Sequence, residues 1–144
     1  MSRIWTAATL AAAASLWAPL AEATDFVTAG GYLFDIQDGR GGATANDGTV
    51  ANGTLGAYDT CYGLRVNGAD YDGGAAPSTV RERSVHMPTV SMPGGVDVTR
   101  HLHVPAAGGD YIRYFDVFEN VGSETATVNV AYRGNLGSDS YTSV

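Results

Sequence analysis

Two histidines separated by one residue, His101 and His103, are the residues of this sequence best placed to bind a transition metal. Alternate residues of a β-strand point to the same face, so both imidazoles would face one way, as two ligands of zinc, copper or iron do. The third histidine, His86, could join them only if its strand lies beside theirs. A solvent-facing histidine pair is the alternative, because two ligands without a third make a poor metal site.

Gly95 stands six residues before His101 and begins a pattern similar to the first cupin motif, Gly-x5-His-x-His. The pattern then departs from that family, because Ala107 and Gly108 occupy the positions where the cupin glutamate would follow. The resemblance to the cupin motif therefore ends at the two histidines, His101 and His103.

Asp70 and Asp72 are a weaker candidate, for calcium, in the oxygen- and glycine-rich segment 67–74, NGADYDGG. Calcium accepts carboxylate and carbonyl oxygens in flexible geometry, which such a segment could supply. The EF-hand register fails, since Gly68 and Thr79 fall where that loop needs acidic ligands. The alternative is an acidic surface turn without an ion, so calcium is the one cofactor left open.

No catalytic nucleophile is placed beside a base in this sequence. Ser138 lacks the surrounding elbow pattern of hydrolases. Asp116 and Glu119 lie three residues apart on a strand-to-turn segment, where their side chains diverge and do not flank a bond. We therefore expect a protein that is not an enzyme within these residues.

Two chemically distinctive residues are expected to be buried, Asp116 partly and Cys61 fully. Asp116 shares its strand face with apolar neighbours, and because a buried charge needs a partner we expect it to pair with Arg100, Arg113 or Arg133. Cys61 is the single cysteine and lies in an apolar run, so we expect it to be buried, with pairing to another chain as the alternative.

Tyrosine is frequent and raises the question of glycan binding, since aromatic rings stack on sugars. Both tryptophans, Trp5 and Trp17, lie in the first 23 residues, which weakens that hypothesis. Most of the tyrosines fall at core positions of the expected strands, so packing with the hydroxyl at the rim is favoured.

The first 23 residues have the three-part layout of a secretory signal peptide. Met1–Trp5 carries one positive charge, the uncharged stretch Thr6–Leu20 is rich in Ala and Leu, and Ala21–Ala23 is a small-any-small cleavage site. The apolar stretch is shorter than the roughly 20 residues of a spanning helix. We expect cleavage before Thr24, export out of the cytoplasm, no membrane span afterwards, and no lipid anchor, since no cysteine follows the cut.

The remaining chain, 24–144, is acidic and contains no lysine, with seven arginines against 14 acidic residues. The absence of lysine excludes a Schiff base and a Walker-A phosphate loop. An acidic surface without basic clusters also argues against binding to nucleic acid or anionic lipid.

Short runs rich in Val, Tyr, Phe and Thr alternate with glycine clusters, which predicts an all-β domain. Roughly seven such runs fit an antiparallel β-sandwich, immunoglobulin-like or supersandwich-like. The expected strands cover 32–36, 62–66, 80–92 with a break at Pro88, 96–104, 111–118 and 125–132, and a last one begins at 141. Asn67-Gly68 is expected to form a tight turn, and segment 40–55 a loop.

The sequence also predicts which faces of three expected strands are buried. In 96–104, the apolar positions Val96, Val98, Leu102 and Val104 share one face and the histidines share the other. Tyr111–Phe118 is apolar on both faces, which predicts a central strand covered on two sides. In 125–132, Ala126, Val128, Val130 and Tyr132 are expected to point inward. The run ending at Val144 suggests a domain truncated at its C-terminus.

The segment from about 63 to 140 resembles a type of secreted bacterial β-sandwich domain of unassigned function found in larger exported or cell-surface proteins. The residues that carry the resemblance are the segments GLRVNG (63–68), VTR (98–100), HVP (103–105), YIRYFD (111–116), ENVG (119–122) and GNLGSD (134–139). None of them is a catalytic signature. The resemblance implies an extracellular location and a modular architecture, and it supplies no active site.

The sequence as a whole favours a non-catalytic structural or interaction module of a secreted or cell-surface bacterial protein, with extracellular proteins or glycans as partners. The alternative is a glycan- or calcium-binding sandwich attached to a catalytic region that is not in this chain.

Overall fold

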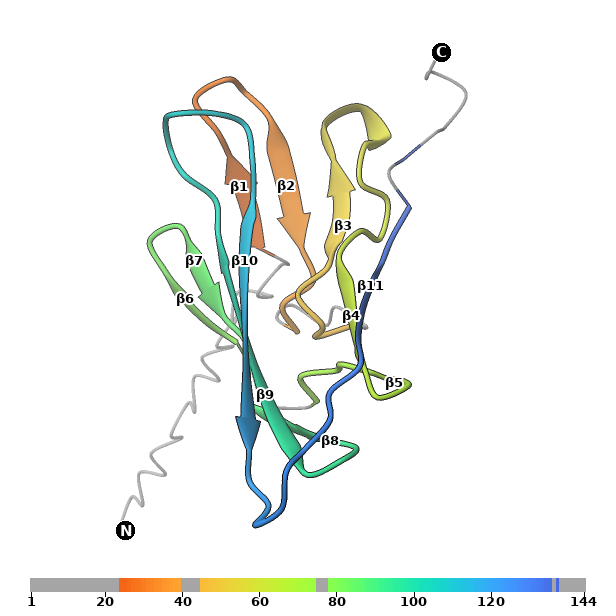
Figure 1. Cartoon of the computed structure of the whole chain (residues 1–144). Helices are drawn as coiled ribbons and strands as arrows, with labels where there is room; N and C mark the ends of the chain where they lie inside the picture. The colour runs from red at the N-terminus through yellow and green to blue at the C-terminus, as the bar shows by residue number, and fades with distance from the viewer. Residues whose placement is uncertain (1–23, 40–44, 75–77, 136, 138–144) are drawn as a thin grey trace, which may run out of the picture.

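The structure, a computed structural model, describes residues 24–39, 45–74, 78–135 and 137 (Figure 1). The expected signal peptide 1–23, Ser138 and the segment 141–144 lie outside the described residues. Within the described part of the chain, no helix is long and apolar enough to cross a membrane.

The fold is all-β with antiparallel sheets, as the sequence predicts. The strands are β1 (Thr24–Val27), β2 (Leu33–Ile36), β3 (Val50–Gly53), β4 (Gly63–Val66), β5 (Ala69–Asp70), β6 (Thr79–Arg81), β7 (Ser84–His86), β8 (Val90–Met92), β9 (Val96–His103), β10 (Arg113–Asn120) and β11 (Val130–Arg133). A single 3-10 turn, η1 (Thr54–Gly56), interrupts them within the described residues.

Three sheets share one core. Their strand orders are β1-β2-β3, β10-β9-β7-β6 with β8 also paired to β9, and β11-β4-β5. The sheet containing β9 and β10 faces β3, β4 and β11 across the molecule (Figure 1). One buried apolar cluster takes side chains from all three sheets, including Phe34, Val50, Leu64, Val85 and Val98. The arrangement is consistent with the expected sandwich-like fold.

Strand β9 has the two faces that its sequence predicts. Val96, Val98 and Leu102 are buried, and the alternate residues point the other way. The same alternation places Arg100 on the apolar face, where its side chain is completely buried. A charged residue in the centre of a core strand needs a partner, and this partner defines the site described below.

The Asn67-Gly68 turn is confirmed. Both residues have positive φ, 48° and 85°, and they connect β4 to β5, with Val66 opposite Ala69. Asn and Gly are the residues that tolerate this left-handed backbone, so the pair closes a tight hairpin.

Two strand predictions are wrong. Strand β10 is not central, because within the described residues it pairs with β9 alone and its alternate residues are exposed. The expected strand 125–132 is reduced to β11, whose four residues are all exposed, so Val130 and Tyr132 do not point into the core. Ala126 and Val128, the other two residues expected to point inward, do pack against the buried apolar core.

Three strands were not predicted at all: β5, which follows the Asn67-Gly68 turn and pairs with β4, and two strands of the first sheet. β1 lies in a segment that has only two large apolar residues, and β3 lies within the small, polar stretch expected to be a loop. Both form because each pairs with β2, a tertiary contact that local composition does not reveal.

Candidate functional site

A buried ion pair joins the two long strands of the largest sheet. Arg100 of β9 lies directly opposite Asp116 of β10, with Arg100 Nε 3.1 Å from Asp116 Oδ1. The side chains are 0% and 2% exposed, respectively. The two atoms are in contact without hydrogen-bond alignment. Of the three arginines that the sequence offers as partners, the structure selects Arg100.

Polar and aromatic groups surround this pair. Arg100 Nη1 donates to the Asp47 carbonyl oxygen at 3.1 Å, and its guanidinium lies 4.4 Å from the centre of the Tyr114 ring. The Tyr132 hydroxyl donates to Asp116 Oδ2 at 2.9 Å and so connects β11 to β10. Burial raises the pKa of Tyr114, whose hydroxyl donates to the Gly48 carbonyl oxygen at 2.9 Å. These contacts are those of a structural clamp.

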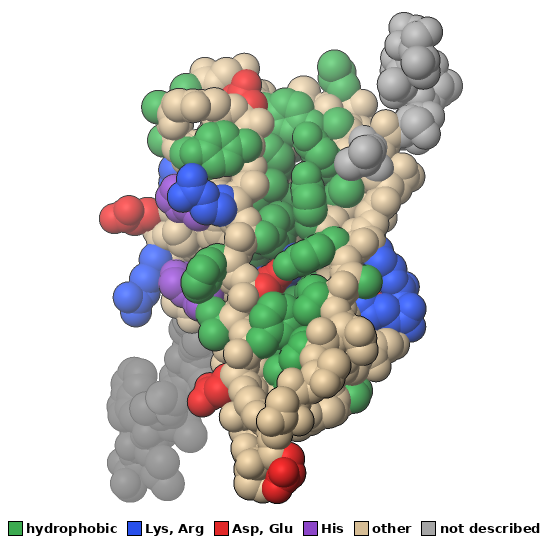
Figure 2. Space-filling model, viewed as in Figure 1, with side chains coloured by type: hydrophobic (Ala, Val, Ile, Leu, Met, Phe, Trp, Pro, Cys, Tyr) green, Lys and Arg blue, Asp and Glu red, His purple; other side chains and the backbone are tan. Residues whose placement is uncertain are grey.

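Apolar side chains are exposed around the free edge of β10. We call this the β10 edge surface and define it by its large exposed residues, Tyr111, Phe115, Val117, Val121, Val130 and Tyr132. Phe115 is 65% exposed and Tyr132 56%. Figure 2 shows hydrophobic side chains gathered on the face that carries β10 and β11. Within the described chain only Val27 and Leu55 are comparable elsewhere, so exposed apolar residues concentrate here.

A row of aromatic rings leads from the β1-β2-β3 sheet to this edge. It passes from Tyr32 and Phe34 to Tyr58, then Tyr62, and ends on Tyr114, with successive ring centres 4.9–6.2 Å apart. The rings at its two ends pack against or within the core, which supports the packing interpretation of these tyrosines.

The histidines are paired across strands. β7 lies beside β9, and His86 stands directly opposite His101, with ring centres 4.6 Å apart. His103 Nδ1 instead lies 2.9 Å from the hydroxyl oxygen of Ser84. The strand of His86 therefore does lie beside that of His101 and His103, and the ring of His86 contacts that of His101. Within the described residues, no group of three or more His, Cys, Asp or Glu could hold a metal ion.

His101 is partly covered. Phe115 of β10 stacks on its ring at 6.4 Å, and its Nδ1 is buried without a hydrogen-bond partner. Burial and the neighbouring His86 lower the pKa of His101, and Asp116 opposes that shift. The neutral form of this histidine is therefore favoured in the folded protein.

Asp70 and Asp72, the calcium candidates, have protein partners. Asp70 Oδ1 lies 2.9 Å from Arg133 Nη2 and 3.5 Å from Arg65 Nε. Asp72 Oδ1 accepts a hydrogen bond from the Gly74 backbone at 3.0 Å. The two arginines already balance the charge of Asp70, so calcium there would compete with them.

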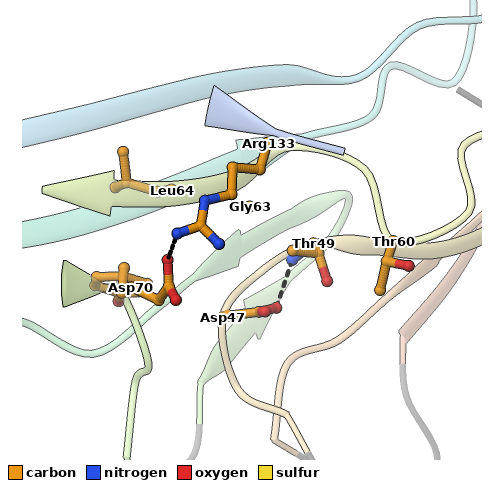
Figure 3. Close-up of a pocket in the computed structure, with 8 residues that line it drawn as sticks. Asp47, Thr49, Thr60, Gly63, Leu64, Asp70 and Arg133 are labelled. Atoms are coloured by element: carbon orange, nitrogen blue, oxygen red, sulfur yellow. Dashed lines mark hydrogen bonds and ion pairs between the residues drawn. The ribbon is translucent and has the colours of Figure 1, made fainter. Parts of the chain in front are cut away.

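A small hollow of about 230 Å³ lies next to Asp70 (Figure 3). It is lined by Asp47, Thr49, Thr60, Gly63, Leu64, Asp70, Tyr71 and Arg133. In Figure 3 the Arg133 guanidinium points toward Asp70, and Asp47 Oδ1 accepts from the Thr49 backbone at 2.9 Å. Sequence reasoning missed this hollow, because its residues come from segments far apart in the chain.

Cys61 is buried, as expected, and is 3% exposed. The backbone of Cys61 forms an isolated antiparallel β-bridge with Val50, which connects β3 to the segment before β4. Its place in the fold is that of a small core residue.

No protein-family model, curated protein or solved structure matches this chain.

Proposed function

We propose that this chain is a non-catalytic interaction module of an exported or cell-surface bacterial protein, and that it contacts its partner through the β10 edge surface. The observation that carries this proposal is the concentration of exposed apolar side chains around a strand edge that no described residue pairs with. Large contiguous apolar patches are uncommon on the surfaces of monomeric proteins and mark interaction sites.

The chemistry of the clamp supports the same function. Asp116 contacts both Arg100 and Tyr132, and Arg100 also donates to the Asp47 carbonyl oxygen, so these contacts connect β9, β10 and β11 beneath the exposed edge. A rigid scaffold under an apolar surface is suited to binding a partner because little order has to be gained on association. Export rests on the signal-peptide pattern of residues 1–23 and on the resemblance to secreted sandwich domains.

Site-specific photocrosslinking in the cell that exports the protein tests this proposal. A photoreactive residue at Phe115 is expected to give a discrete crosslinked product. The matched position is Arg81 on β6, the strand at the opposite edge of the same sheet, where little product is expected. Equal crosslinking at the two positions, or none at Phe115, would contradict the proposal.

A second candidate function is binding of a small polar ligand, glycan or calcium, in the hollow of Figure 3. It is favoured by the two carboxylates and two threonines that line this hollow. Calcium titration followed by calorimetry, together with a glycan array, tests it. Binding that is lost in Asp47→Asn would support it, and no binding in either assay would exclude it.

A further inference from the structure

We propose that the partner at the free edge of β10 is a second copy of this chain, with the two β10 strands paired antiparallel about a two-fold axis at Asp116. The inference rests on the proposed function and deepens it by naming the partner. It follows from the direction of the backbone groups, from the order of side chains along β10, and from the charges at its two ends.

The backbone groups that face outward from β10 can be identified. The Val121 amide donates to the Gly95 carbonyl oxygen, so residue 121 faces β9. Hydrogen bonding to one neighbour alternates along an antiparallel strand, so the other odd-numbered residues of β10 face β9 as well. Tyr114, Asp116 and Phe118 therefore direct their N–H and C=O groups to the edge of β10 that has no strand partner in the described part of the chain. An unpaired row of this kind is a template for a further strand.

Symmetry then restricts the register. Pairing two copies so that core faces remain on one side requires each residue to oppose one of the same parity. With Asp116 opposite Asp116, Phe115 stands opposite Val117 of the second copy, and Arg113 stands opposite its Glu119. Both are non-hydrogen-bonded pairs, in which side chains approach most closely.

With Asp116 at the centre, apolar residues stand opposite apolar residues and opposite charges stand opposite each other. Centring the pair on Val117 would place Phe115 against Glu119, and centring it on Phe115 would place Arg113 against Val117. Opposite charges directly across two strands stabilise the pair, whereas an apolar ring against a carboxylate does not. Because the contact is two-fold, each favourable pair occurs twice.

The meeting of two Asp116 residues does not oppose this arrangement. Each carboxylate already contacts its own Arg100 at 3.1 Å and accepts a hydrogen bond from its own Tyr132 at 2.9 Å. The charge of Asp116 is thus balanced within each chain before association. The apolar exposure of Phe115 and Val117 is also accounted for, since these side chains would cover each other across the new pair.

Sedimentation analysis of the purified, processed protein tests the inference through a charge swap. Arg113→Glu and Glu119→Arg are each expected to weaken the dimer about tenfold or more, since a like-charge contact of about 1.4 kcal/mol corresponds to tenfold. The double variant Arg113→Glu/Glu119→Arg restores the opposite charges and should return close to the unsubstituted dissociation constant. Arg81→Glu and Glu124→Arg are the matched controls and should not alter it.

A disulfide experiment checks the register without reversing charges. A mixture of Phe115→Cys and Val117→Cys chains is expected to crosslink faster than either chain alone. A protein that is monomeric at about 200 μM would overturn the inference, because its self-association would then be weaker than about 5 kcal/mol. Unchanged single variants or an unrestored double variant would also overturn it.

The two proposals fail differently. A monomeric protein whose Phe115 crosslinks to another protein would end the self-pairing and keep the interaction module. A monomeric protein without any Phe115 crosslink would end both.

Discussion

At the residue scale, the Arg100–Asp116 pair is the contact whose loss should cost most. Asp116→Asn would leave a buried guanidinium without its counter-charge, and we expect a loss of about 3–5 kcal/mol in the free energy of unfolding. Urea denaturation measures this loss. The control is Asp70→Asn, which breaks exposed ion pairs and should cost less than about 1 kcal/mol. Equal losses in the two variants would show that the buried pair is not a clamp.

His101 gives a pH dependence whose sign follows from its lowered pKa. The unfolded histidine binds a proton near pH 6.5, and the folded one binds it only at lower pH. Stability contributed by the neutral form is therefore present at pH 7 and is lost as the pH falls below about 6.5. The rings of His86 and Phe115 lie against His101, and the charge of Asp116 on the other face of the sheet opposes the shift.

His101→Gln should flatten the decline of unfolding free energy between pH 7 and pH 5.5, measured by urea denaturation. His86→Gln should flatten it in part, because it removes one cause of the shift. Thr99→Gln, which changes the same strand face without adding or removing a titratable group, should keep the slope of the original protein. A slope that His101→Gln does not change would refute this account.

The sequence predicted that Asp116 would pair with an arginine, but it did not predict which residues meet across neighbouring strands. The position of Asp116 on an apolar strand face predicted a partly buried carboxylate with an arginine partner, but three arginines remained open. Arg100 could have been chosen, because it shares its parity with Val96, Val98 and Leu102. The His86–His101 contact could not be chosen, since it depends on which strands are neighbours.

At the element scale, the β4–β5 turn holds three segments together through one side chain. Asn67 Nδ2 donates to the Pro93 carbonyl oxygen at 2.7 Å, and the Asn129 amide donates to Asn67 Oδ1 at 2.8 Å. Asn67→Ala would remove both bonds and place alanine at a φ of 48°, so we expect a loss of about 2–3 kcal/mol.

Thermal or urea unfolding monitored by circular dichroism measures this loss. Asn52→Ala on the exposed part of β3 is the matched control and should change stability by less than about 0.5 kcal/mol. A loss in Asn67→Ala no larger than in this control would mean that the turn does not hold the segments together.

The elements also show where sequence patterns mislead. The apolar residues on both faces of 111–118 predicted a central strand, whereas the structure leaves β10 at an edge with Phe115 and Val117 exposed. The composition of a strand reports how much surface it has to bury. It does not report whether that surface is buried within the chain or against another molecule.

At the scale of the whole molecule, the expected processing site adjoins the fold. β1 begins at Thr24, the residue expected to follow the cleavage site. We expect protein recovered from the extracellular fraction to begin at Thr24, as measured by N-terminal sequencing and intact mass. Ala23→Asp should block this cleavage, since the site requires a small residue there. Extracellular protein that still carries Met1 would contradict the signal-peptide interpretation.

The all-β fold followed from the glycine-punctuated strand pattern, and the structure has antiparallel sheets that share one buried apolar cluster. The candidate surface did not follow, because an edge exists only once the order of strands is known. The apolar residues of β10 are visible in the sequence, but that Phe115 and Val117 are exposed is known only from the structure.

The central claim, that the β10 edge surface is the contact surface of an exported interaction module, is tested most directly by carbene footprinting. Labelling is measured on the protein in intact cultures of the cells that export it, and on the purified protein at high dilution. Phe115, Val117 and Tyr132 should be labelled several-fold less in place, while Leu55, which is 92% exposed and lies on η1, should be labelled equally in both. Equal labelling of Phe115 and Leu55 under the two conditions would contradict the claim.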